Sequence, residues 1–128
     1  VSNLISGMEI FGDSENRLPN TLDLGFEGVE GDTLLISLDM AGVAVSTGSA
    51  CSSGSGLPSP VLTAMGIPFD KINSSIRFSF GWSNTTAEIE KAAKILAQTV
   101  SLNRTGTAME GSKKINETPL KFNRYKIY

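Results

Sequence analysis

Cys51 is the only thiol in a chain of 128 residues that contains no histidine. It stands in the segment 46–59, where nine of the fourteen residues are serine or glycine. A structural cysteine usually behaves as a small buried hydrophobe, whereas a reactive thiol must be accessible. A segment so rich in small polar residues favours a functional thiol, although the composition alone leaves a buried cysteine as the alternative.

Arg77 is the second residue whose type could do chemistry. It lies in the alternating segment 75–80, on the side opposite to Ile76, Phe78 and Phe80. A planar guanidinium suits the bidentate binding of a carboxylate, and a solvated strand face explains the same pattern. The spacing leaves both interpretations open. Asn20, which follows a proline, is by its position typical of a turn.

The composition excludes several classes of function. Without histidine the chain can form neither a Ser-His nor a Cys-His catalytic pair, and one cysteine cannot build a conventional zinc site. A net charge of −2 argues against nucleic acid as the main partner. There is no apolar run of about 18 residues and no signal-peptide pattern, so we expect no contact with a membrane. A single cysteine fits a reducing compartment, which predicts a cytoplasmic location.

Alternating strands and helices must position these residues. Hydrophobic spacing and turn residues predict strands over 21–26, 43–45 and 75–80, and helices over 31–40, from Pro60 to Gly66, and from Thr86 to about Val100. The last helix opens with the capping-box pattern of Thr85 and Glu88.

Charge divides the chain into two parts. Residues 1–103 carry a net charge of −6, and residues 104–128 carry a net charge of +4. We therefore expect one folded domain over 1–103 and a basic tail over 104–128. The tail is either a flexible terminus that can fold back on the acidic body or an arm that docks to a partner.

Four runs of residues carry a resemblance to a known family. They are RLPNT at 17–21, VEGD at 29–32, VAVSTGSACSSGS at 43–55 and SSIRFS at 74–79. In this order they resemble the C-terminal portion of the cysteine desulfurases of the NifS/IscS type, over roughly residues 8–100. The combination of GSACxS with SIRxS is specific, and it resembles the group with the longer, mobile catalytic loop.

The resemblance implies a function for both candidate residues. In such enzymes L-cysteine is converted to L-alanine, so Cys51 would accept the sulfur as a persulfide and pass it to an acceptor such as an iron–sulfur cluster scaffold. Arg77 and Asn20 would bind the substrate. The catalytic loop would include the neighbours of the cysteine, which are Ser49, Ala50, Ser52, Ser53 and Gly54.

The resemblance also implies what this chain does not carry. Its cofactor, pyridoxal phosphate, would be held by a large domain absent from this chain, so no cofactor-binding residue and no metal ligand is expected here. The implied fold is α/β, an α+β layer in which a small, largely antiparallel sheet is covered by helices, like the C-terminal small domain of fold-type I pyridoxal-phosphate enzymes. The full enzyme would be a homodimer, and the chain alone would be inactive. Leu57 and Pro60 depart from the family pattern.

Two other functions remain compatible with the residues. The first is a non-enzymatic sulfur-carrier or interaction domain that retains the Cys51 segment and works without cofactor. The second is a lyase that acts on a related amino acid such as selenocysteine. A cofactor-binding region upstream of Val1 would favour the enzyme, and a comparison of products from cysteine and selenocysteine would identify the lyase.

Overall fold

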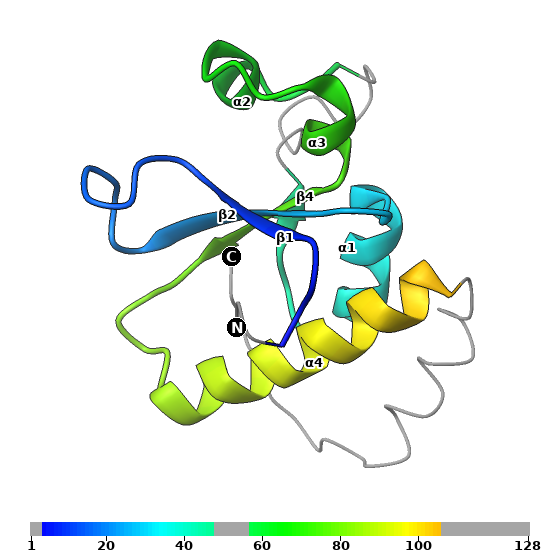
Figure 1. The fold of residues 1–128 in the computed structure, drawn as a ribbon. Coiled ribbons are helices and arrows are strands. Elements are labelled where there is room, and N and C mark those ends of the chain that lie inside the picture. The colour runs from blue at the N-terminus through cyan, green and yellow to red at the C-terminus, as the bar shows by residue number, and fades with distance from the viewer. Residues whose placement is uncertain (1–3, 48–56, 106–128) are drawn as a thin grey trace.

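The computed structural model of the chain describes residues 4–47 and 57–105. Its strands and helices, in chain order, are β1 (Met8–Phe11), β2 (Thr21–Phe26), α1 (Gly31–Met40), β3 (Ser46–Thr47), α2 (Pro60–Ala64), α3 (Phe69–Asn73), β4 (Ser75–Ser79) and α4 (Thr86–Arg104). Figure 1 shows a central sheet with α1 and α4 on one side and α2 and α3 on the other.

The strands form one four-stranded sheet in the order β1-β2-β4-β3, and every neighbouring pair is antiparallel. Because β2 and β3 both run antiparallel to β4, they run parallel to each other with β4 inserted between them. Helix α1 makes the crossover from β2 to β3, which is the split βαβ arrangement. The predicted fold class, a small antiparallel sheet covered by helices, is confirmed.

One face of the sheet carries the main hydrophobic core. Leu24, Phe26, Ile76 and Phe78 are buried on β2 and β4, at the alternate positions that the sequence predicts. They pack against α1 and α4, whose buried contributions are Leu34, Leu38, Ala92, Ile95, Leu96 and Val100. This face explains why the alternation of the two strands and the spacing of the two helices could be recognised in the sequence.

The opposite face of the sheet carries a smaller cluster under α2 and α3. Phe11 of β1, Leu62 of α2 and Ile72 of α3 are its buried members. Phe11 lies across Gly25 of β2, where an added Cβ would come within 2.6 Å of the Phe11 ring. The glycine therefore makes room for the aromatic side chain that anchors this second layer.

Helix α4 begins where the capping box predicts. The Thr85 hydroxyl accepts a hydrogen bond from the Glu88 backbone N–H (3.3 Å), and the Glu88 carboxylate accepts one from the Thr85 N–H (2.9 Å). The helix continues past Val100 to Arg104, so the first residue of the expected tail is helical. The Arg104 side chain donates from Nε to the Glu27 carbonyl (2.9 Å), which ties the helix end to the loop after β2.

The predicted strand at 43–45 is wrong. The last sheet strand before the cysteine segment is β3 at Ser46–Thr47. The Val43 N–H donates instead to the Leu38 carbonyl (2.8 Å) after Gly42, whose φ of 89° lies in the left-handed region. This closure of α1 uses the Val43 N–H, and Val43 forms only an isolated bridge in place of a continuous strand. The side chains of Val43 and Val45 pack in the core.

Two elements were not predicted, β1 and α3. β1 is an edge strand in which Glu9 and Ile10 are exposed, so its sequence lacks a clear apolar alternation. α3 is five residues long and has one buried residue, Ile72, which is too little for a helical period. Both elements exist because of tertiary contacts, β1 with β2 and α3 with the second cluster.

Several predicted features lie outside the described residues. These are Cys51 with its loop neighbours Ser49, Ala50, Ser52, Ser53 and Gly54, and the tail beyond Thr105. Among the helices that the structure describes, none is long and apolar enough to cross a membrane. The same part of the chain contains no group of three or more His, Cys, Asp or Glu residues that could hold a metal ion.

Candidate active site on the second face of the sheet

Arg77 belongs to a row of residues that crosses all four strands. The pairing register places Phe11 of β1 opposite Asp23 of β2, Asp23 opposite Arg77 of β4, and Arg77 opposite Ser46 of β3. Directly opposite residues of antiparallel strands point to the same face. Since Ile76 and Phe78 fill the core on one face, Arg77 and its row lie on the other, the face that α2 and α3 partly cover.

Asp23 and Arg77 face one another as opposite charges in a half-buried environment. Burial raises the pKa of the Asp23 carboxyl, and the positive charge of Arg77 acts in the opposite direction as the smaller influence. Asp23 Oδ1 and Arg77 Nε are buried, and neither has a hydrogen-bond partner among the residues that the structure describes. A buried polar atom without a partner is costly, so both side chains have unused capacity to bind a polar group.

The two side chains do not satisfy each other. Directly opposite residues of this kind have Cβ atoms about 4.5–5.5 Å apart, well within the reach of an Asp–Arg ion pair. The ion pair found among the described residues is instead Lys71–Glu9. The guanidinium of Arg77 therefore forms no salt bridge with Asp23, and it remains able to bind a carboxylate from outside the chain.

The row ends at the strand from which the Cys51 segment departs. Ser46 pairs with Arg77, and the next residue, Thr47, pairs with Ile76 and is the last described residue before the segment. The chain is described again from Leu57, and Ser59 then caps α2 by accepting a hydrogen bond from the Leu62 N–H (3.4 Å). One end of the segment that carries the thiol is therefore fixed beside Arg77.

Asn20 is not brought against Arg77. It precedes β2, its carbonyl accepts a hydrogen bond from the Phe80 N–H (2.8 Å), and its side-chain oxygen accepts a long one from Thr21 (3.5 Å). Asp23 lies three residues further along the chain, a distance of about 10 Å in an extended strand. Asn20 joins the ends of β2 and β4, and its role in binding substrate stays a prediction.

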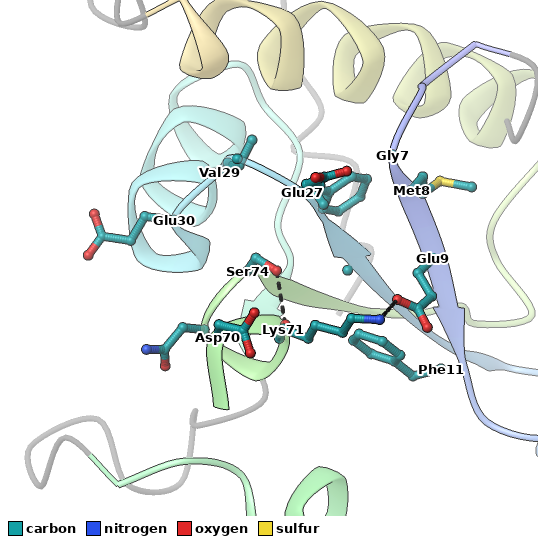
Figure 2. Close-up of a pocket in the computed structure, with 14 residues that line it drawn as sticks. Gly7, Met8, Glu9, Phe11, Glu27, Val29, Glu30, Asp70, Lys71 and Ser74 are labelled. Carbon is teal, nitrogen blue, oxygen red and sulfur yellow. Dashed lines mark hydrogen bonds and ion pairs between the residues drawn. The ribbon is translucent and has the colours of Figure 1, made fainter. Parts of the chain in front are cut away.

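A groove of about 860 Å³ lies on the same face, beyond Phe11 and Gly25 (Figure 2). Its lining includes four carboxylate residues, Glu9, Glu27, Glu30 and Asp70, and one basic residue, Lys71. The Lys71 ammonium is paired with Glu9 (2.6 Å), and this hydrogen bond raises the pKa of the lysine. Because the surplus charge of the groove is negative, it disfavours an anionic ligand, and Arg77 marks the better site for a carboxylate.

Sequence reasoning identified Arg77 but missed Asp23 and Ser46. Asp23 stands between Leu22 and Leu24, so the alternation of 21–26 already places it on the face away from the core. Its contact with Arg77 depends on the register between strands that are more than fifty residues apart, and no local pattern contains that information.

The chain is similar in sequence to cysteine desulfurases. It is 56% identical over 93 residues to the putative cysteine desulfurase IscS 1 of Bacillus subtilis (strain 168), a match that covers 72% of this chain and 24% of that protein. It is 39% identical over 117 residues to the cysteine desulfurase IscS of Dictyoglomus turgidum, covering 91% of this chain and 30% of that protein. The chain thus spans about a quarter to a third of the length of these relatives.

The solved structures and the family model agree with this similarity. A NifS-like protein superposes with a TM-score of 0.65 at 32% identity, covering 78% of this chain and 24% of that one. A NifS-like protein from Rickettsia africae gives a TM-score of 0.58, also at 32% identity, covering 74% and 23% of the two chains. The aminotransferase class-V model matches residues 3–92. The chain therefore belongs to the class-V aminotransferase family, within which the relatives named above are cysteine desulfurases.

Proposed function

We propose that the chain supplies the sulfur-accepting thiol and the carboxylate-binding arginine of a pyridoxal-phosphate-dependent cysteine desulfurase. The observation that carries the proposal is the row of residues across the sheet. Arg77 faces away from the core and has no ion-pair partner within residues 4–47 and 57–105, and its neighbour strand β3 leads directly into the segment with Cys51. The substrate carboxylate would then be bound from β4, and the thiol would be carried by the segment that follows the adjacent strand β3.

In the proposed reaction the sulfur of L-cysteine moves to the Cys51 thiolate. The sulfur–sulfur bond of a persulfide forms while the carbon–sulfur bond of the substrate breaks. The electron pair of the broken bond stays on carbon, which takes up a proton, so that L-alanine leaves. Oxidation of the two sulfurs balances reduction of the carbon, and no external oxidant is required. Arg77 would hold the substrate by its carboxylate.

The described residues do not fit a bound pyridoxal phosphate. A Schiff base with this cofactor requires a lysine amine. Lys71 is paired with Glu9 at the groove, and Lys91 and Lys94 lie on α4, across the sheet from Arg77. The family resemblance assigns the cofactor to a large domain, and the limited span of this chain against its relatives supports that assignment.

The remaining features of the whole enzyme are proposals by resemblance. They are a homodimer in the cytoplasm, L-cysteine as the substrate, and an iron–sulfur scaffold or another sulfur-acceptor protein as the recipient. The basic tail 104–128 carries a net charge of +4. It is a candidate for contact with an acidic partner, because charge complementarity steers association.

The test of the proposed function is the intact mass of the chain after incubation with L-cysteine and pyridoxal phosphate, with and without the large domain. We expect the added mass of one sulfur atom when both parts are present, and its loss in Cys51→Ser. Stability should change by less than about 0.5 kcal/mol in this variant, because the serine- and glycine-rich sequence around Cys51 predicts a loop position that contributes little packing. Sulfur on the isolated chain would instead favour a stand-alone carrier, and no sulfur in either sample would contradict the proposal.

A second test addresses Arg77 in the assembled enzyme. Replacement by alanine removes a charge-assisted contact, so KM for L-cysteine should rise about 10- to 100-fold. Arg77→Lys should recover only part of this loss, since an ammonium cannot make the bidentate contact. Arg17→Ala removes an exposed arginine of the β1–β2 loop and serves as the matched control. An unchanged KM in Arg77→Ala would show that another group binds the carboxylate.

A further inference from the structure

We propose that the acidic groove on the second face of the sheet is the docking site for residues 106–128 of the chain's own basic tail. This groove is the cavity of about 860 Å³ beyond Phe11 and Gly25. Of the two destinations that the sequence leaves open for the tail, the acidic body and a partner, this is the first, with a defined site. Neither Cys51 nor Arg77 takes part, so the docking is independent of the proposed sulfur transfer.

The groove holds more negative charge than its own residues neutralise. Of its four carboxylate residues, Glu9 forms an ion pair with Lys71, and Glu27, Glu30 and Asp70 are exposed around it (Figure 2). The hydrogen bond and the charge of Glu9 raise the pKa of Lys71 most, and the negative charges of Asp70 and Glu27 raise it further. Negative charge gathered in a concave surface attracts cations, so the ligand of this groove is positively charged.

The carboxylates of the groove are too dispersed to share one small cation. Within residues 4–47 and 57–105, no group of three or more His, Cys, Asp or Glu residues is arranged to hold a metal ion. Glu9 lies in β1, Glu27 follows β2, and Asp70 lies in α3. A ligand that satisfies these carboxylates must carry several positive charges spaced along its length, as a basic peptide segment does.

The basic tail starts at the rim of this groove. Arg104, its first residue and the last of α4, donates from Nε to the Glu27 carbonyl (2.9 Å). A Cβ added to Gly7 would lie 3.2 Å from Arg104 Nη2, and one added to Gly28 would lie 3.9 Å from Arg104 Cγ. Gly7, Glu27 and Gly28 all line the groove. The chain beyond Thr105 therefore departs from the edge of the groove, where one basic residue of the tail already lies.

The tail has the charge and the length to occupy the groove. Lys113 is nine residues beyond Arg104, so an extended chain can carry it up to about 30 Å from the rim. Exposed ion pairs are individually weak. Attachment to the same chain nevertheless gives the tail an effective concentration in the millimolar range, at which several weak contacts together hold it. Beyond Thr105 the tail carries two acidic side chains and five basic ones, which are Lys113, Lys114, Lys121, Arg124 and Lys126.

Zero-length cross-linking of the full chain tests the docking, because a carbodiimide joins a lysine amine only to a carboxylate in contact with it. The linked peptides of the monomer are identified by mass spectrometry. We expect the tail lysines to be linked to Glu27, Glu30 or Asp70 at least about fivefold more often than to Glu90. Glu90 is the matched reference, since it is an exposed carboxylate outside the groove, about 20 Å along α4 from Arg104 and within reach of the tail.

Variants of the tail give a second readout. In the full chain, Lys113→Gln combined with Lys114→Gln should shift the backbone amide resonances of Glu27 and Asp70. Raising the salt concentration from about 0.1 M to about 1 M shortens the screening length from about 10 Å to about 3 Å. The difference between this variant and the unmodified chain should then disappear. The control Lys94→Gln removes an exposed lysine of α4 and should leave both resonances unchanged.

Equal linkage to Glu90 and to the carboxylates of the groove would overturn the docking. Links confined to a cross-linked dimer would instead assign the groove to the tail of a second copy. Groove resonances that do not respond to the change of Lys113 and Lys114 would assign it to a partner from outside the chain. Each of these results rejects the proposal and leaves the sulfur transfer to Cys51 standing, because that transfer is measured separately by mass.

Discussion

At the scale of the residue, Asp23 carries a cost for folding. Its carboxyl lies in a half-buried environment, where no described residue forms a hydrogen bond with Oδ1, and burial raises its pKa. An acid whose pKa is raised by folding binds its proton more tightly in the native state than in the unfolded state. Its contribution to stability is present at low pH and is lost as the pH rises through the raised pKa.

Replacing Asp23 by asparagine should therefore stabilise the chain increasingly as the pH rises. The difference in the free energy of unfolding between Asp23→Asn and the unmodified chain should be larger at about pH 7 than at about pH 3, as measured by urea unfolding. Asp13 provides a control of opposite sign, because the N–H groups of Asn16 and Glu15 lower its pKa. Asp13→Asn should become more destabilising as the pH rises. An equal effect of Asp23→Asn at both pH values would contradict the buried-carboxyl explanation.

At the scale of the element, α1 packs at its first residue with almost no clearance. A Cβ added to Gly31 would lie 2.7 Å from the Asn73 carbonyl oxygen and 3.1 Å from that of Ser75. These oxygens belong to the backbone where α3 gives way to β4, so they cannot move aside as a flexible side chain would. The glycine at the start of α1 thus sets how closely the helix approaches the strand that bears Arg77.

Gly31→Ala should destabilise the chain by about 1–3 kcal/mol through this overlap. The change improves helix propensity by about 1 kcal/mol at most, so steric overlap decides the sign. Thermal or urea unfolding measures the effect. Gly81→Ala is the matched control, because an added Cβ there meets nothing closer than 3.8 Å. It should change stability by less than about 0.5 kcal/mol. A Gly31→Ala variant as stable as the control would disprove the close approach.

At the scale of the whole molecule, two hydrophobic clusters of unequal size lie on the two faces of the sheet. The larger joins the sheet to α1 and α4, and the smaller holds α2 and α3 through Phe11, Leu62 and Ile72. Local stability follows the number of buried apolar contacts. The layer of α2 and α3, which connects the Cys51 segment to β4, therefore has the lower local stability of the two.

Two leucine truncations should separate these layers. Leu38→Ala in α1 removes a fully buried side chain, so we expect a loss of about 2–5 kcal/mol in global stability. That loss is a large share of the roughly 5–15 kcal/mol typical of a domain. Leu62→Ala should instead lower amide protection mainly over 60–73, with less effect on the amides of α4. Hydrogen exchange read by mass spectrometry distinguishes the two, and uniform loss of protection in Leu62→Ala would show one cooperative unit.

Much of the fold could be predicted because the main core has regular spacing. The alternation of β2 and β4, the apolar face of α1 and the capping box of α4 all appear in consecutive residues. β1 and α3 could not be predicted, because both are short and their positions depend on partners distant in sequence. The apolar run 43–45 was misread for a related reason, since the Val43 N–H is used to close α1.

The sequence by itself determined the family, the candidate thiol Cys51 and the arginine on the polar side of its strand. These three conclusions depend only on which residue types follow one another along the chain. Only the tertiary structure decided that Arg77 lies between Asp23 and Ser46, because register joins strands that are remote in the chain. It also decided that Asp23 and Arg77 face each other without pairing, a property of side-chain geometry that no local pattern records.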